Sequence, residues 1–247
     1  MDNGKILVEE FVEAQVNTWK NKVLKEDKKV IPRFSVITVC MEPGSGGSIV
    51  AAEIAKQLDF DFFHHEIINK IAKSSQISIE VIETLEKERL SGINDFISSL
   101  IDDKYLWPGL YLEHLMKIVH VIGEHGRAVI VGRGANFILP KQERLSVRVV
   151  SPLDVRIQNV VHEYGVSENE AKQRILRRES MRRAFVRQSF DEDIANPLNY
   201  DLILNMRKLS NKSAINAVIG ALGVAYLNRN SERIPSNLLR GQRGNLN

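Results

Sequence analysis

Short apolar runs alternate with amphipathic stretches along most of this chain. Five runs rich in β-branched or aromatic residues predict strands, at residues 35–40, 59–63, 127–131, 145–150 and 200–204. Helical spacing of the apolar positions predicts helices at about 49–58, 65–74, 78–90, 92–102, 109–125, from 154 onward, at 167–189 and at 211–227. Because the strands are nearly all apolar and alternate with helices, the pattern predicts an α/β fold with a parallel sheet covered on both faces.

The same pattern divides the 247 residues into three parts. Residues 1–33 predict an N-terminal helical extension, whose apolar stripe at about 5–28 packs on the core or on a second copy of the chain. Residues 34–227 form the α/β domain. Residues 228–247 are polar and basic, and we expect them to form a flexible tail.

A glycine-rich turn separates the first predicted strand from the helix that follows it. The segment SVITVCMEPGSGGSIVAAE, residues 35–53, has the strand–turn–helix order in which backbone N–H groups bind phosphate. The P-loop pattern GxxxxGK[ST] is only half met: Met41 replaces the first glycine and Gly47 the lysine, whereas Ser48 keeps the magnesium-ligating hydroxyl. The sequence therefore predicts an anion site of main-chain amides. Its residues are Gly44, Ser45, Gly46, Gly47 and Ser48. A plain, tight connection between strand and helix is the alternative.

Other polar residues reach the same edge of the predicted sheet, because the carboxyl ends of parallel strands lie together. Arg133 follows a strand and lies between Gly132 and Gly134. Glycines on both sides let a ligand approach closely, and the guanidinium matches a phosphate or carboxylate, so we expect Arg133 to bind a ligand. His64 and His65 follow the second predicted strand; we expect His64 at the substrate, although either histidine can simply begin a helix.

Arginine is concentrated between residues 144 and 187, which indicates a local anionic ligand. Ser167 and Glu170 form a capping box that opens the helix predicted at 167–189. Within it, Arg174, Arg178 and Arg182 recur every four residues and share a face. This helix holds few acidic residues, so its basic face is either simply solvated or binds a polyphosphate.

Composition excludes several classes of protein. No apolar run approaches the roughly 20 residues of a membrane-spanning helix, and the N-terminus is not a signal peptide, so we expect a cytoplasmic protein without a membrane partner. A single cysteine, Cys40, excludes an internal disulfide, and the scattered histidines argue against a cysteine–histidine metal site. Few aromatic residues accompany the arginines, which makes nucleic-acid binding an unfavoured third hypothesis.

Five segments resemble the bacterial cytidylate kinase-like family, a branch of the nucleoside monophosphate kinases within the P-loop fold. They are VITVCMEPGSGG, FDFFHHEIINKIA, AVIVGRGANFIL, LSVRVVSPLDVRI and NYDLILN, in that order. The resemblance covers residues 34 to about 222, and GSGG and VGRGANFIL are its specific motifs.

The resemblance implies a P-loop nucleotide kinase-like fold with a five-stranded parallel sheet and an arginine-bearing lid at about 167–192. It implies ATP and Mg²⁺ as cofactors and a nucleoside monophosphate, CMP-like, or another small phosphorylated acceptor. The turn at 44–48 would hold the donor phosphates and Ser48 the metal. Arg133, His64 and Arg174 would bind the acceptor, and Arg133, Arg178, Arg182 and Arg183 would act in catalysis.

The sequence also departs from this family. Its members usually place arginines where Met41 and Ser48 stand, and often an aspartate at His64. Because stabilisation of phosphoryl charge is most of what a kinase contributes, the alternative is a catalytically weak or inactive relic. Such a protein would sense a nucleotide or polyanion, or act as a protein-interaction module. A homo-oligomer formed through the N-terminal helix is a further possibility.

Overall fold

Five parallel strands form one sheet in the order β2-β3-β1-β4-β5. The computed structural model describes residues 10, 12–20, 36–73, 81 and 110–230. The strands are β1 (Val36–Met41), β2 (Asp61–Phe63), β3 (Ala128–Val131), β4 (Arg144–Val150) and β5 (Leu202–Asn205). The predicted α/β fold with a five-stranded parallel sheet is confirmed.

The central strand β1 is apolar along its length because both of its faces are covered. Val36 pairs with Ala128 of β3 and with Arg144 of β4, and every β1 residue from Val36 to Cys40 is buried. Val and Ile suit this position because branched side chains pack well on a pleated, buried surface.

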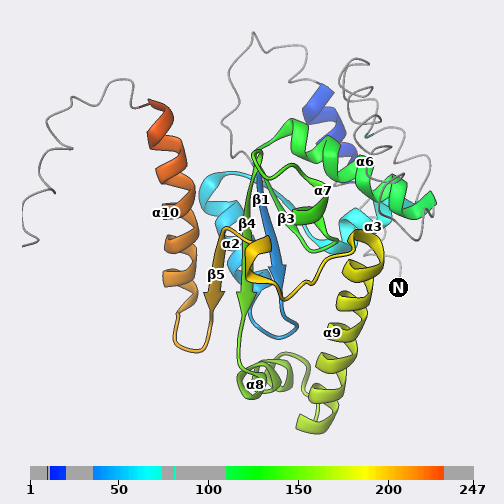
Figure 1. Cartoon of the computed structure of the whole chain (residues 1–247), viewed down its shortest axis with the longest axis vertical. Coiled ribbons are helices and arrows are strands. Elements are labelled where there is room, and N and C mark those ends of the chain that lie inside the picture. Colours follow the sequence, from blue (N-terminus) through cyan, green and yellow to red (C-terminus); the bar gives the residue numbers. More distant parts are fainter. Residues whose placement is uncertain (1–9, 11, 21–35, 74–80, 82–109, 231–247) are drawn as a thin grey trace, which may run out of the picture.

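Helices cover both faces of the sheet (Figure 1). The labelled helices are α2 (Gly47–Leu58), α3 (His65–Lys73), α6 (Leu110–His125), α7 (Ala135–Ile138), α8 (Leu153–Tyr164), α9 (Glu168–Phe190) and α10 (Asn211–Asn230). Of these, α8 and α9 pack on each other. On one face, α2 and α10 bury Ile54 and Ile215 against Ile37 of β1. On the other face, α3 and α6 bury Ile68 and Met116 in a second cluster.

The N-terminal segment packs on the chain's own core where it is described. Residues 12–20 are helical, and Val12, Val16 and Trp19 are buried in the cluster formed with α3 and α6. The Trp19 ring stacks on His125, with ring centroids 4.2 Å apart, and lies 6.0 Å from Phe63. The rest of the extension, most of the helices predicted at 78–90 and 92–102, and residues 231–247 lie outside the described residues.

Several predicted boundaries shift for identifiable reasons. The strand expected from Arg127 begins at Ala128, because Arg127 has a φ of 49° and ends the turn after α6. The strand expected from Tyr200 begins at Leu202, because Tyr200 closes the short 3₁₀ turn Pro197–Asn199. The closing helix continues to Asn230, past the predicted end at 227.

Helix α9 begins as predicted, but only half of the capping box forms. The Ser167 hydroxyl accepts a hydrogen bond from the Glu170 amide at 3.3 Å. The Glu170 carboxylate does not return the bond and pairs with Arg174 at 2.6 Å. In the part of the chain that is described, no helix has both the length and the apolar content needed to cross a membrane.

Candidate active site

The glycine turn presents free main-chain amides at the start of α2. Gly44 and Gly46 have φ values of 79° and 81°, which favour glycine because a side chain is strained there. The Gly46 carbonyl accepts bonds from Ile49 and Val50, and so begins the helix. The amides of Gly46, Gly47 and Ser48 meet no acceptor among the described residues. Three N–H groups at a helix N-terminus are suited to bind an anion.

The turn is held from behind by α8. The carbonyl oxygen of Gly44 accepts a hydrogen bond from Asn159 at 2.8 Å. A Cβ atom on Gly44 would lie 2.7 Å from the Arg156 carbonyl oxygen, so only glycine lets α8 approach this closely. The Ser45 amide is used inside the turn, donating to the Glu42 carbonyl at 3.1 Å. These contacts hold the turn against α8.

The usual P-loop has a glycine at the position of Met41 and a lysine at the position of Gly47, so in this chain the large residue comes first and the small residue second. A Cβ atom on Gly47 would lie 2.7 Å from Met41 Cβ and 3.1 Å from Val149 Cβ. The Met41 side chain therefore occupies the space into which a lysine at position 47 would extend. The Ser48 hydroxyl donates to the Met41 sulfur at 3.3 Å, so the predicted metal ligand has a protein partner in this structure.

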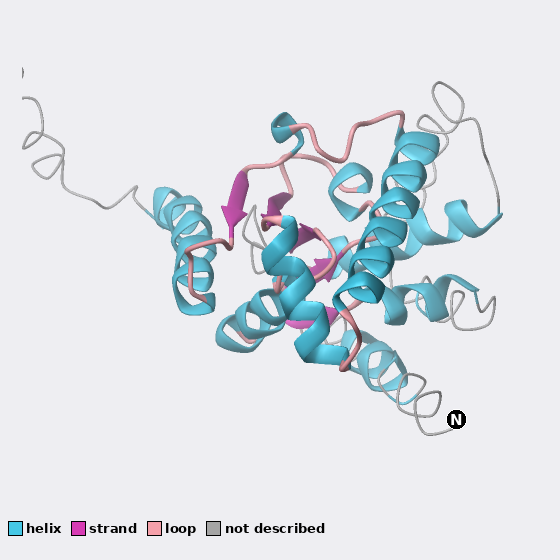
Figure 2. Cartoon of the chain, turned by 90° about the horizontal axis from the view of Figure 1, so that it is seen from below, coloured by secondary structure: helices cyan, strands magenta, loops and turns pink. Residues whose placement is uncertain are grey.

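A pocket of about 410 Å³ lies beside this turn, between the ends of β1 and β3 and the helix α9. Its walls are mostly apolar, with Met41, Phe137, Met181, Phe185 and Ile194 among them. Its charges are all positive among the described lining residues and come from Arg133, Arg178 and Arg182. Figure 2 views the chain from below Figure 1, the side toward which the strands point. A pocket of this size with three guanidinium groups suits a small organic anion.

Arg133 is held in a strained conformation that directs it to this pocket. Its φ is 56°, and Gly132 and Gly134 on either side have φ values of 78° and 69°. Non-glycine residues in this region cost about 1–3 kcal/mol and cluster at functional sites. The Arg133 Nε atom is buried without a partner among the described residues. An unpaired buried donor in a strained residue makes Arg133 a candidate contact for an anion.

Asn136 is a second pocket residue with an unused donor, and the sequence alone did not indicate it. Its side chain is 5% exposed, and its Nδ2 atom has no partner in the described structure. Its backbone carbonyl accepts a hydrogen bond from Arg144, which fixes the segment. The signals in the sequence are its position two residues after the Arg133–Gly134 turn and its place inside the motif VGRGANFIL.

The two histidines of the α3 start lie against each other. His64 Nε2 and His65 Nδ1 are 3.0 Å apart, so one ring donates and the other accepts. Burial, the adjacent His64 and the nearby Arg133 lower the pKa of His65 to about 4, and burial also lowers the pKa of His64. Both rings are neutral at pH 7. His65 lines the pocket, whereas His64, the predicted substrate residue, does not line it and contacts Phe62.

The structure divides the predicted arginine face of α9. Arg178 and Arg182 line the pocket. Arg174 pairs with Glu170 and lies over the Tyr164 ring at 6.0 Å, outside the pocket. It shares their face, but it is about 12 Å along the axis from Arg182, at 1.5 Å per residue. Arg183 is exposed and does not line the pocket. The structure thus does not bring Arg174 and Arg183 together with the other predicted site residues.

Three arginines expected to serve an anionic ligand bind the protein itself. Arg156 pairs with Glu179 of α9 at 2.8 Å and with Glu42 at 3.5 Å. Arg148 lies 3.7 Å from the other Glu42 oxygen, and Arg144 donates to the Leu139 carbonyl at 3.1 Å. All three arginines are buried. The expectation from arginine density was wrong for them, because buried guanidinium groups need partners and find them in carbonyls and carboxylates.

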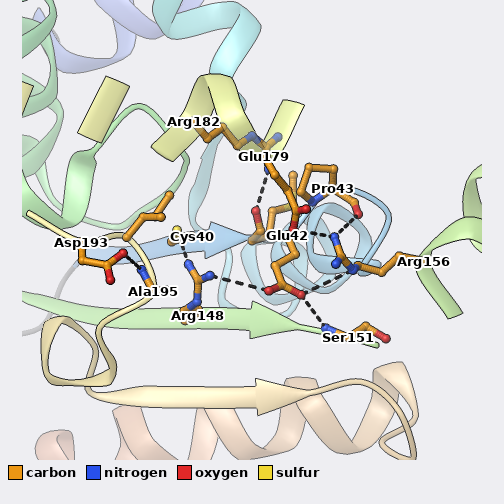
Figure 3. A network of polar contacts seen from close by, with 12 residues as sticks. Cys40, Glu42, Pro43, Arg148, Ser151, Arg156, Glu179, Arg182, Asp193 and Ala195 are labelled. Atoms are coloured by element: carbon orange, nitrogen blue, oxygen red, sulfur yellow. Dashed lines mark hydrogen bonds and ion pairs between the residues drawn. The ribbon is translucent and has the colours of Figure 1, made fainter. Parts of the chain in front are cut away.

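Glu42, Arg156 and Glu179 tie α9 to the loop that precedes the glycine turn (Figure 3). Glu42 also accepts a hydrogen bond from the Ser151 amide at 3.0 Å. No carboxylate cluster suited to a metal ion occurs within the described ranges. Among the described residues, Ser48 is therefore the predicted metal ligand. Its hydroxyl would have to give up its hydrogen bond to the Met41 sulfur to bind a metal ion.

Known proteins similar to this chain agree with the geometry. The sequence profile of the cytidylate kinase-like family matches residues 36–208, which is more than half of the chain. A cytidylate kinase from Ignicoccus hospitalis is 22% identical over 186 residues, covering 75% of this chain and 97% of that protein. A cytidylate kinase from Pyrococcus horikoshii is 26% identical over 188 residues, covering 76% and 88%.

A solved structure shares the fold. An uncharacterized protein from Eubacterium ventriosum superposes with a TM-score of 0.55 at 21% identity, covering 76% of this chain and 98% of that one. The family profile spans β1 to β5, and with them the glycine turn, Arg133 and the arginines of α9. This chain belongs to the cytidylate kinase-like family.

Proposed function

We propose that this protein transfers the γ-phosphoryl group of ATP to a nucleoside monophosphate, CMP-like, or to another small phosphorylated acceptor. The observation that carries the proposal is the meeting of two anion sites at one edge of the sheet. Free amides lie at the start of α2, and three arginines line the adjacent pocket. Family membership and the cytidylate kinases among its relatives support the same reaction class.

The donor site is the turn at residues 44–48. Gly46, Gly47 and Ser48 would donate their amides to phosphate oxygens, and the positive end of the α2 dipole would add to the attraction. ATP would supply the transferred group, and the Ser48 hydroxyl would help to hold Mg²⁺, which would neutralise some of the phosphate charge. Position and electrostatics are most of what a protein adds to this chemistry.

The acceptor site is the pocket. Arg133 and Arg178 would hold the acceptor phosphate, while Phe137 and Phe185 offer apolar walls to the remainder of the molecule. An oxygen of that phosphate attacks the γ-phosphorus, and the bond to the bridging oxygen breaks as the new bond forms. The leaving ADP keeps the bridging oxygen. No general base is needed, because the acceptor phosphate is already ionised.

One observation favours a second candidate, a protein that binds nucleotide without turning it over. Met41 fills the space of the P-loop lysine, and the Ser48 hydroxyl is bonded to the Met41 sulfur. A protein with these features can retain the amide cradle and lose transfer, since loss of a single cation at the transferred group can cost about 10³- to 10⁵-fold in rate.

A coupled assay of ADP release separates the two candidates. The folded protein is given Mg²⁺–ATP and a panel of ribo- and deoxyribonucleoside monophosphates, and calorimetry measures nucleotide binding in parallel. Turnover with at least one acceptor supports the kinase. Binding of Mg²⁺–ATP with no turnover on any acceptor supports the sensor, and absence of both binding and turnover contradicts both.

A further inference from the structure

The space of the missing lysine is closed by Met41. A Cβ atom at position 47 would approach Met41 Cβ to 2.7 Å and Met41 Sδ to 3.0 Å. Because the nearest atom is itself a Cβ, a change of rotamer at Met41 cannot relieve the contact. In an ordinary P-loop the lysine reaches the β- and γ-phosphates. This chain cannot supply that charge from position 47 while Met41 is present.

A different cation lies at the same place. Arg182 Nη1 donates to the carbonyl oxygen of Met41 at 2.6 Å, so the guanidinium lies directly over the last residue of β1. Figure 3 shows Arg182 reaching from α9 over this strand end. The bond to one carbonyl uses only one of its five N–H donors, and no other acceptor for this side chain lies within hydrogen-bond distance in the described structure.

Arg182 forms no ion pair among the described residues. The nearest acidic side chain on α9, Glu179, is already paired with Arg156 at 2.8 Å. Arg178 and Arg133 add two further positive charges around the pocket. Burial first, and then Arg178 and Arg133, lower the pKa of Arg182, while Cys40 and Glu179 act in the opposite direction. A largely buried guanidinium among other cations is stabilised by an anion.

We propose that Arg182 takes over the role of the P-loop lysine. Because Met41 leaves no room for a lysine at position 47, the positive charge comes from α9 instead. The inference rests on the proposed nucleotide site at residues 44–48. It assigns to Arg182 the phosphates of the donor, whereas Arg133 and Arg178 serve the acceptor.

Delivery of the charge from α9 makes it depend on how α9 is docked. Glu179 lies one turn before Arg182, and its ion pair with Arg156 joins α9 to α8. Arg156 in turn contacts Glu42, the residue after Met41. Glu42, Arg156 and Glu179 are therefore positioning residues: they place Arg182 over the Met41 carbonyl without touching a phosphate themselves.

The test measures binding of Mg²⁺–ATP by calorimetry to the full chain and to matched variants. Arg182→Gln keeps a donor and removes the charge, whereas Arg182→Lys keeps the charge. Arg187→Gln is the control, because Arg187 lies on the same helix with its side chain 66% exposed. A hydrogen bond to a charged group is worth about 1.5–3 kcal/mol, so Arg182→Gln should weaken binding by about 10- to 100-fold. Arg182→Lys and Arg187→Gln should each change binding less than about fivefold, within 1 kcal/mol.

A further variant tests whether a lysine at position 47 can replace the charge of Arg182. Met41→Gly with Gly47→Lys, in the Arg182→Gln background, should recover about tenfold or more of the lost affinity, because it restores one cation at the other side of the same site. Met41→Gly with Gly47→Ala in that background should recover none. Circular dichroism confirms that each variant is folded.

The outcomes separate this inference from the proposed function. If the unmodified protein does not bind Mg²⁺–ATP, the donor site itself is wrong and the inference fails with it. If the unmodified protein binds and Arg182→Gln binds equally well, only the role of Arg182 is overturned. Equal weakening by Arg182→Gln and Arg187→Gln would show a diffuse charge effect and would also overturn it.

Discussion

Replacing Gly47 by alanine should destabilise this protein, although alanine is normally favoured over glycine in a helix. Gly47 is the first residue of α2 and does not have a positive φ, so alanine would otherwise gain up to about 1 kcal/mol. The added Cβ would meet Met41 Cβ at 2.7 Å and Val149 Cβ at 3.1 Å. Overpacking of this kind costs about 1–3 kcal/mol. We expect a net loss of about 1–2 kcal/mol in the free energy of unfolding.

A double-mutant cycle isolates the Met41 contact. In a Met41→Gly background only the 3.1 Å contact with Val149 Cβ remains, so Gly47→Ala should cost less than in the unmodified protein, and the two substitutions should couple by about 1–2 kcal/mol. Equilibrium urea unfolding, followed by circular dichroism, measures each corner of the cycle. Gly220→Ala is the matched control, because Gly220 is also helical and a Cβ there meets nothing within 4 Å. Additivity within about 0.5 kcal/mol would refute the argument.

Three other substitutions test separate parts of the account. Gly134→Ala should lower the free energy of unfolding by about 1–3 kcal/mol more than Gly165→Ala. Both glycines have a positive φ, but only at Gly134 would the added Cβ collide with the Phe190 ring. Equal losses would contradict this packing. Asn136→Leu should raise stability and also raise the KM of the acceptor, because it removes an unpaired buried amide that serves only the complex; unchanged KM would argue against that role. Burial lowers the pKa of His120 to about 4 from an unfolded value of 6.5, so the unfolded state binds more protons between these values and stability falls as the pH drops from about 6.5 to 4. His120→Gln should remove about 3 kcal/mol of the stability change between pH 6.5 and pH 4, which urea unfolding at several pH values would measure. An unchanged pH dependence would mean that another group causes it.

The fold could be predicted from the sequence because its signals are local. The β-branched runs of β1 and β3 are buried on both faces, and the glycine turn lies between a strand and a helix as its residues require. Arg133 was predicted for the same reason: two flanking glycines indicate a backbone that turns sharply at a strand end. These features depend on neighbours in the chain, which one sequence shows directly.

The division of the arginines could not be predicted, because it depends on contacts between distant segments. Arg156 and Arg182 are both arginines beside apolar residues in the sequence, yet among the described residues Arg156 pairs with Glu42 and Glu179, whereas Arg182 bonds to a carbonyl. Helical spacing placed Arg174 on the face of Arg182, but it did not show which part of that face lies over the pocket. The partner of each arginine and its place relative to the pocket are set by how α8 and α9 pack.

The histidine pair shows the same limit of a single sequence. The sequence analysis expected His64 at the substrate, whereas His65 is the histidine that lines the pocket. His64 is the last residue before α3 and His65 the first residue within it, and the turn between them directs His65 to the pocket and His64 toward Phe62. Because an α-helix has about 3.6 residues per turn, neighbouring side chains point about 100° apart around its axis.

The absence of the P-loop lysine does not by itself exclude nucleotide binding. The amides of Gly46, Gly47 and Ser48 meet no acceptor among the described residues, and Arg182 brings a cation to the same strand end. The proposed phosphate site would thus combine main-chain donors from one segment with a charge from another that lies more than 130 residues away in the sequence.

A crystal structure with Mg²⁺ and a non-hydrolysable ATP analogue tests this account most directly. We expect phosphate oxygens within hydrogen-bond distance of the Gly46, Gly47 and Ser48 amides, with the Arg182 guanidinium turned from the Met41 carbonyl to the β- and γ-phosphates. A saturated complex with its phosphates away from this turn, and with Arg182 still on the Met41 carbonyl, would contradict the account.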